Sequence, residues 1–133
     1  MIVRLHDGDK LVAGLEQALR ESYTRSAVVV CGIGAVKDIE VGTNMGAGEY
    51  NKHKFAGPAS LVSLSGVITG DSSSGPYRPH LHMMFADSDS KAWGGHLFAA
   101  TVLGAAEVTL LPINDSRLTR KRDDKHGIEA LDF

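Results

Sequence analysis

The sequence contains little cysteine and no long hydrophobic run. Its 133 residues include one cysteine, Cys31, which excludes an internal disulfide framework and a thiolate-rich metal site. Its place after three valines predicts a small buried core residue rather than a nucleophile. No apolar run reaches the ~18 residues that span a bilayer, and Arg4, His6 and Asp7 predict a first strand rather than a signal peptide. We therefore expect a cytoplasmic protein that does not contact a membrane.

The chain also lacks a strong excess of positive charge. Its formal net charge is −2 and its pI is near 6.3, whereas domains that bind nucleic acid are normally clearly basic. The cations are nevertheless uneven, because a C-terminal segment over about residues 114–133 holds Arg117, Arg120, Lys121, Arg122 and Lys125. Aspartates interrupt this segment, which favours a solvated charged tail over a phosphate-binding patch.

The hydrophobic pattern predicts one domain over residues 1–133, long enough to bury a core. Residues 1–6 alternate as in a strand, and leucines at helical spacing predict one amphipathic helix from Lys10 to about Thr24. Further strands are expected at 27–41, 50–55, 61–69 and 107–113 and in a histidine-rich hairpin, with loops over 42–48 and 70–77. One principal helix and about seven strands indicate an α+β fold with a mainly antiparallel sheet.

Three histidines carry the clearest chemical signal. His80 and His82 share one face of a strand, because strand side chains alternate with a period of two. A hairpin centred near Asp89 places His82 opposite His96 and His80 opposite Phe98, and residues directly opposite have Cβ atoms about 4.5–5.5 Å apart. Three neutral imidazole nitrogens with an open fourth position are the usual arrangement of a catalytic zinc ion. The sequence therefore predicts a divalent metal site, with zinc as the expected ion.

Other interpretations stay open. The three histidines could be half-buried polar residues of a sheet, and a register slip of one residue would turn His96 to the opposite face. Arg78 could hold an anionic substrate or be an exposed loop arginine, and Glu107 is either a candidate carboxylate or a salt-bridge partner. No nucleophile and base can be paired, so the catalytic residues are unknown. His6, His53 and His126 have no partner at a useful spacing and are expected on the surface or in the tail.

Several segments together resemble the domain conserved between plants and prokaryotes (PPC). They are Gly32-Ile33-Gly34-Ala35, Tyr50, Leu61-Val62-Ser63-Leu64-Ser65-Gly66, His80-Leu81-His82, Gly94-Gly95-His96-Leu97, Ala106-Glu107-Val108 and residues 122–132. The resemblance implies a homotrimer with sheet surfaces buried between protomers. Bacterial members are described as DNA-binding proteins by analogy with plant relatives that carry AT-hooks, but this chain contains no Arg-Gly-Arg-Pro segment.

The resemblance also bears on the histidines. The family fold is similar to acetolactate decarboxylase, in which an HxH pair and a later histidine hold zinc, and this likeness implies the same ligand role for His80, His82 and His96. Fold similarity does not transfer a reaction. Relatives commonly carry Glu two residues after the proline before the Leu-Ser-Leu segment, where this chain has Ser60. If that Glu acts as a base or orients a ligand in relatives, this chain lacks the group.

Three functional hypotheses follow. The first is a regulatory or DNA-binding homotrimer of the PPC type with a three-histidine divalent metal site. The second is a zinc-dependent enzyme that acts on a small anionic metabolite, with zinc as Lewis acid or source of bound hydroxide. The third is a protein-assembly unit in which the histidines have only structural roles.

Overall fold

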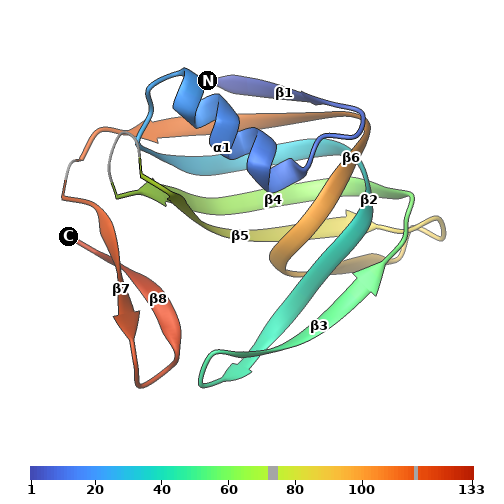
Figure 1. Cartoon of the computed structure of the whole chain (residues 1–133). Coiled ribbons are helices and arrows are strands. Elements are labelled where there is room, and N and C mark those ends of the chain that lie inside the picture. Colours follow the sequence, from blue (N-terminus) through green and yellow to red (C-terminus); the bar gives the residue numbers. More distant parts are fainter. Residues whose placement is uncertain (72–74, 116) are drawn as a thin grey trace.

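The computed structural model describes residues 1–71, 75–115 and 117–133. The described part contains one helix and eight strands, shown in Figure 1. In chain order they are β1 (Ile2–His6), α1 (Leu11–Glu21), β2 (Ser26–Gly46), β3 (Glu49–Phe55), β4 (Ala59–Gly70), β5 (Tyr77–Ala86), β6 (Ala92–Ile113), β7 (Thr119–Asp123) and β8 (Ile128–Asp132). Part of the loop expected over 70–77 lies outside the described residues.

Six strands form the main sheet, in the order β1-β6-β5-β4-β2-β3, and every pair is antiparallel. The two long strands β2 and β6 also pair with each other, with several register shifts. Figure 1 shows both strands bending away from the flat part of the sheet toward β3. This arrangement confirms the α+β fold with a mainly antiparallel sheet. The expected strand at 107–113 is the second half of β6, which runs without interruption from the histidine hairpin.

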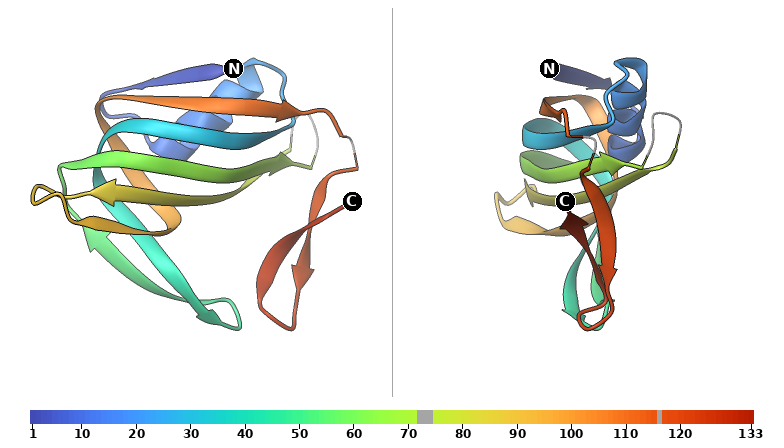
Figure 2. Two further views of the ribbon diagram at one scale, coloured as in Figure 1. Left: turned by 180° about the vertical axis from the view of Figure 1, so that it is seen from behind. Right: turned by 90° about the vertical axis from the view of Figure 1, so that its left-hand side faces the viewer.

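The hydrophobic core lies between α1 and one face of the sheet, as Figure 2 shows from the side. Leu11, Leu15 and Leu19 of α1 are fully buried, because spacings of four residues place them on one face of a helix. Successive side chains of a strand point to opposite faces of the sheet. Leu110 is therefore buried on the face toward α1, whereas Leu111 is exposed on the other face. At eleven residues α1 is too short to cross a bilayer, and the described chain has no other helix.

The structure of the glycine-rich stretch 42–48 differs from the sequence prediction. It was expected to be a loop, but β2 continues to Gly46 and turns through Ala47 and Gly48 into β3. Gly42 pairs with Lys52 on one side and with His96 on the other. Tertiary pairing on both edges therefore outweighs the low strand propensity of glycine.

The C-terminal segment also differs from the expectation. Instead of a solvated tail, β7 and β8 form a two-stranded hairpin. Leu118, just before β7, is buried, and the Arg120 side chain donates hydrogen bonds to the main-chain oxygens of Val67 and Arg78 in the main sheet. Backbone pairing and these long-range bonds order a segment whose composition is typical of a solvated surface.

Cys31 is exposed, so its predicted place in the core is wrong. The pairing of β2 with β6 shifts register between Val29 and Cys31. An extra residue in one strand breaks the alternation of faces, and Val30 and Cys31 are both exposed as a result. The apolar run Val28-Val29-Val30-Cys31 gave no sign of this bulge.

The packing of α1 on the sheet yields a test of the fold. We expect Leu15→Ala to lower the free energy of unfolding by about 2–5 kcal/mol, because it opens a cavity at a fully buried position. Gln17→Ala on the exposed side of the same helix should change it by less than about 0.5 kcal/mol. Urea denaturation of both variants checks this, and equal effects would contradict the core described here.

Candidate metal centre

The β5–β6 hairpin has the register that the sequence predicted for its central pair. His82 lies opposite His96, and the pairing continues to Ala86 and Ala92. Asp87 fixes the turn, because its carboxylate accepts hydrogen bonds from the backbone N–H groups of Asp89 and Lys91 and from the Trp93 indole, at 2.9–3.0 Å. The bond from Trp93, followed by that from Lys91, lowers the pKa of Asp87. These bonds favour the ionised turn residue and hold one register.

The pairing of His80 differs from the prediction. The β5–β6 ladder ends at His82 and His96, so His80 has no partner in β6 and does not lie opposite Phe98. It pairs only with Val67 of β4, on the other edge of β5. The cause is a bend of β6 at Gly95, whose φ is +156°. A Cβ atom there would lie 2.7 Å from the carbonyl oxygen of Gly42 in β2. Glycine therefore allows β6 to approach β2 here and to leave β5 directly after His96.

All three histidines lie on the sheet face opposite α1 and come close together. On β5 the residues between and after them, Leu81 and Met83, are buried in the core, so His80 and His82 point to the other face. The three ring centroids are 5.2–5.4 Å apart. One nitrogen from each ring lies within 4.8 Å of those of the other two.

The spacing of these nitrogens fits a tetrahedral ion. The Nε2 atoms of His80 and His82 are 3.3 Å apart. Two nitrogens that bind one zinc ion at about 2.0–2.1 Å with tetrahedral angles are about 3.3–3.4 Å apart. The same distance also allows a hydrogen bond between the two rings, which is the arrangement expected without an ion.

Two of the rings, those of His80 and His96, have the protonation state that metal binding requires. Burial lowers the pKa of His96 to about 4, with smaller effects from His80, His82 and Lys52. Burial also lowers the pKa of His80, with further effects from Arg120 and His82. Both rings are therefore neutral at pH 7, and a neutral imidazole has a lone pair to offer.

His96 has an unsatisfied buried nitrogen. Within the described residues its Nδ1 atom has no hydrogen-bond partner, which is uncommon for a buried polar atom. The rings of Tyr50 and Phe98 pack against His96 at 5.1 and 4.8 Å between centroids. An apolar surrounding of this kind makes an unpaired nitrogen costly unless something binds it. The residues present therefore fit a metal ion.

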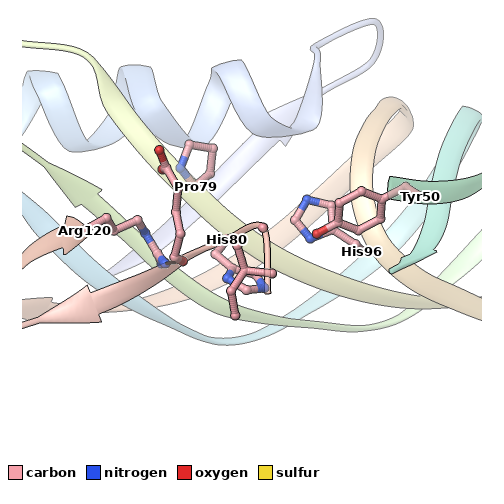
Figure 3. Close-up of a pocket in the computed structure, with 8 residues that line it drawn as sticks. Tyr50, Pro79, His80, His96 and Arg120 are labelled. Carbon is pink, nitrogen blue, oxygen red and sulfur yellow. Dashed lines mark hydrogen bonds between the residues drawn. The ribbon is translucent and has the colours of Figure 1, made fainter. Parts of the chain in front are cut away.

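A cavity of about 220 Å³ opens beside His80 and His96 (Figure 3). Tyr50 of β3 closes it at the His96 end, and Arg120 with residues 127–129 of the C-terminal hairpin forms another wall. A second cavity, of about 460 Å³, borders His80, His82 and Arg120 and continues along the β7–β8 hairpin. His80 and Arg120 are thus shared by both cavities.

Two hairpin tips meet below the first cavity, where Figure 1 shows the β2–β3 and β7–β8 ends approaching each other. A Cβ atom at Gly48 would lie 2.6 Å from the carbonyl oxygen of Gly127. Glycine is therefore required at this close approach. The contact joins the β2–β3 hairpin to the C-terminal hairpin.

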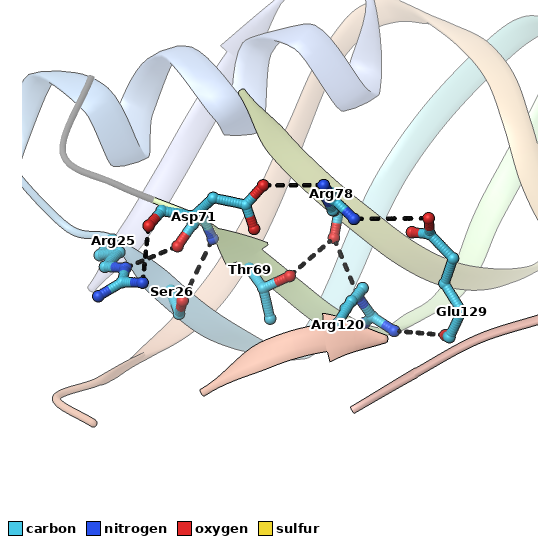
Figure 4. A network of polar contacts seen from close by, with 8 residues as sticks. Arg25, Ser26, Thr69, Asp71, Arg78, Arg120 and Glu129 are labelled. Carbon is cyan, nitrogen blue, oxygen red and sulfur yellow. Dashed lines mark hydrogen bonds and ion pairs between the residues drawn. The ribbon is translucent and has the colours of Figure 1, made fainter. Parts of the chain in front are cut away.

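The arginine at the cavity is not the one that the sequence suggested. Arg78 lies in β5 and forms ion pairs with Asp71 at 2.9 Å and with Glu129 at 3.5 Å (Figure 4). Arg120 lines the cavity instead. The sequence did not indicate that Arg120 lines a cavity, because this residue stands in a charged stretch. Its place at the cavity depends on how β7 docks against β4 and β5.

The remaining candidates lie elsewhere. Glu107 pairs with Arg4 of β1 and with Ile33 of β2, and it lines neither cavity. Ser60 lies opposite Ala86, at the end of β5 distant from His82. His6 and His53 are exposed as expected. His126, also exposed, bonds to Asp123 through Nδ1 at 2.7 Å.

Two solved structures resemble this chain over nearly its whole length. A protein from Archaeoglobus fulgidus, described as metal-containing, is 30% identical with a TM-score of 0.84, over 98% of this chain and 91% of that chain. The "Putative DNA-binding protein" of Ralstonia eutropha JMP134 is 25% identical with a TM-score of 0.86, over 99% of this chain and 90% of that chain. Both share the fold described above.

A curated relative is much longer. The "Bifunctional protein GlmU" of Synechococcus sp. (strain JA-2-3B'a(2-13)) is 26% identical over 130 residues, which are 97% of this chain and 19% of that protein. The chain thus spans about a fifth of the length of the curated relatives it matches.

The sequence also matches a defined domain family. The match covers residues 1–114 and ends before the C-terminal hairpin. It includes the three histidines and the helix, and the fold agrees with the α+β architecture that the resemblance implied. The chain belongs to the Plants and Prokaryotes Conserved (PCC) domain family, abbreviated PPC above.

Proposed function

We propose that this protein binds one divalent metal ion per chain through His80, His82 and His96, with zinc as the ion. The observation that carries the proposal is the convergence of three ring nitrogens within 4.8 Å. The neutral state of His80 and His96 supports it, as does the unpaired Nδ1 of His96. The Archaeoglobus fulgidus relative that is described as metal-containing supports it as well.

Three protein ligands leave a coordination position for another molecule. A zinc ion with three imidazole ligands supplies a Lewis acid and can lower the pKa of bound water to about 7. The position would face the cavity between His80, His96 and Arg120. A zinc-dependent enzyme that acts on a small anionic metabolite is therefore the alternative function, and its catalytic residues remain unassigned.

We further propose that the protein is a homotrimer in the cytoplasm. Large apolar side chains are 44–59% exposed on the sheet face opposite α1: Val30, Ile33, Val62, Met84 and Leu111. Each stands directly beside a buried residue of its own strand, as the alternation of faces requires, and strands β2, β4, β5 and β6 all contribute. Exposed apolar surface shared by neighbouring strands is typical of a protein–protein interface. The family resemblance supplies the threefold state.

DNA binding is a second candidate function, favoured by the name of the Ralstonia eutropha relative. The contacts of the C-terminal cations limit which of them could bind DNA phosphates. Arg117 pairs with Asp115 and Arg122 with Asp124, while Arg120 faces the main sheet. In the described part of the chain, Lys121 and Lys125 form no ion pair and would be the phosphate contacts. A trimer would present them three times, which raises avidity where the geometry allows simultaneous contact.

The metal site is tested by substitution. We expect the purified protein to hold about one zinc ion per chain, and His82→Ala to lose it, because two ligands bind zinc far more weakly than three. His53→Ala removes an exposed histidine of β3 and should keep the full metal content. Atomic emission measures both. Wild-type protein that contains no transition metal, and takes none up, would contradict the proposal.

The trimer is tested by charge at the apolar face. We expect Ile33→Glu to dissociate the trimer, because the burial of an unpaired carboxylate in an interface is unfavourable. Glu21→Lys on the exposed side of α1 is the matched control and should leave the trimer intact. Light scattering coupled to size exclusion gives the mass of each. A wild-type mass equal to the 14.2 kDa chain would refute the trimer.

DNA binding is tested by its response to salt. We expect a duplex to be shifted in a gel at about 50 mM salt and released near 200 mM, because phosphate contacts release counterions. Charge reversal at Lys121 and Lys125 together should weaken the shift, whereas reversal of Lys10, which bonds to Thr101, should not. A wild-type protein that gives no shift at low salt has no DNA-binding function of this kind.

A further inference from the structure

Arg120 has no carboxylate in direct contact with it in the described part of the chain. Its Nε, Nη1 and Nη2 atoms donate to the main-chain oxygens of Arg78, Glu129 and Val67 at 3.1–3.3 Å. These acceptors are neutral, and no carboxylate among the described residues lies within ion-pair distance of the guanidinium. By contrast, Arg78 beside it has two carboxylate partners (Figure 4). Arg120 therefore has no direct carboxylate partner at this site, although the Glu129 carboxylate acts on it from a greater distance.

The guanidinium is also partly removed from water. Burial lowers the pKa of Arg120, with a further effect from Arg78 and an opposing one from Glu129. A half-buried cation is costly unless an anion compensates it. Three of its five N–H groups are used by the main-chain oxygens. Two N–H groups remain with which a carboxylate can form bonds.

This charge faces the predicted metal ligands across the first cavity. Figure 3 shows Arg120 reaching from β7 toward His80, with His96 and Tyr50 at the far end. Lys52 lies near His96, with its Nζ atom 3.9 Å from the centre of the Phe98 ring, but it pairs with Glu40 at 3.5 Å and does not line this cavity. A bound divalent ion would add two more positive charges. A cavity bordered by Arg120 and such an ion attracts an anion.

The cavity size and its polar groups limit the ligand further. A volume of about 220 Å³ is below the roughly 300 Å³ at which pockets for drug-sized ligands begin. Tyr50 supplies a hydroxyl at the cavity wall, and the described residues provide no hydrogen-bond partner for it. The one carboxylate at the wall, Glu129, pairs with Arg78. The arrangement suits a molecule with few atoms and more than one acceptor oxygen.

We infer that this cavity binds a small organic acid, with one carboxylate on Arg120 and another oxygen at the open position of the metal ion. The inference rests on the metal site proposed above. In this site a residue of the C-terminal hairpin binds the carboxylate of the ligand. The hairpin lies beyond residue 114, where the family match ends. A planar guanidinium and a carboxylate form paired, parallel hydrogen bonds, which gives such a site geometric selectivity.

Malonate is the probe for the test, used with the full-length protein loaded with zinc. We expect calorimetry to detect its binding to wild-type protein, and Arg120→Gln to weaken that binding about 10- to 100-fold, since a charged hydrogen-bond partner is lost. Arg122→Gln is the matched control on the same strand, because Arg122 pairs with Asp124 on the exposed surface. It should leave the affinity unchanged, and both variants should keep their zinc.

Three results would overturn the inference. They are zinc-loaded wild-type protein that does not bind millimolar malonate, Arg120→Gln protein with wild-type affinity, and tighter binding of inorganic phosphate than of malonate. If Arg120→Gln does not fold, Tyr50→Phe is the second test, because it removes a hydroxyl from the cavity wall and leaves every hydrogen bond of Arg120 in place. Weaker malonate binding would support the site, and unchanged affinity would contradict it. Protein that takes up no zinc refutes the metal site itself, which separates the two proposals.

With cobalt in place of zinc, malonate should also change the visible absorption, because a ligand oxygen enters the coordination shell. An unchanged spectrum with malonate bound would place the acid away from the metal and contradict the two-point mode of binding.

Discussion

The register of the β5–β6 hairpin is the constraint on which the rest of the site depends. Side chains alternate across a strand, so a slip of one residue would move His96 from the outer face into the core. Asp87 prevents this slip, because one carboxylate holds two backbone N–H groups and the Trp93 indole at the turn. The hairpin therefore presents both His82 and His96 on the same face, and the β4 pairing of His80 brings in the third ring.

The sheet separates stability from chemistry. The face toward α1 holds the leucines, Met83 and Phe85 of the core, whereas the opposite face holds the histidines and the exposed apolar residues. Desolvation of the His80 and His96 rings has a free-energy cost, which appears as their lowered pKa. The packed face provides the free energy of folding that offsets this cost. Functional residues can then change without altering the core.

Sequence patterns predicted the part of the molecule that depends on local rules. The pattern of one helix and about seven strands was sufficient for the fold class. The period of two for His80 and His82, and a short turn before His96, were sufficient for the histidine cluster. Three features depended on contacts between distant segments and could not be read locally. They are the bulge that exposes Cys31, the end of the β5–β6 ladder at His96 that leaves His80 without a partner in β6, and the docking of Arg120 on the main-chain oxygens of β4 and β5.

The contact between Gly48 and Gly127 means that the cavity is assembled from both halves of the chain. Such a closure is entropically expensive, because the two segments are far apart in the sequence. The β7–β8 hairpin buries little apolar side chain, so its detachment costs less free energy than unfolding of the main sheet. We therefore expect the hairpin that forms the cavity wall to open more readily than the central strands, so that its amide protons exchange with solvent sooner.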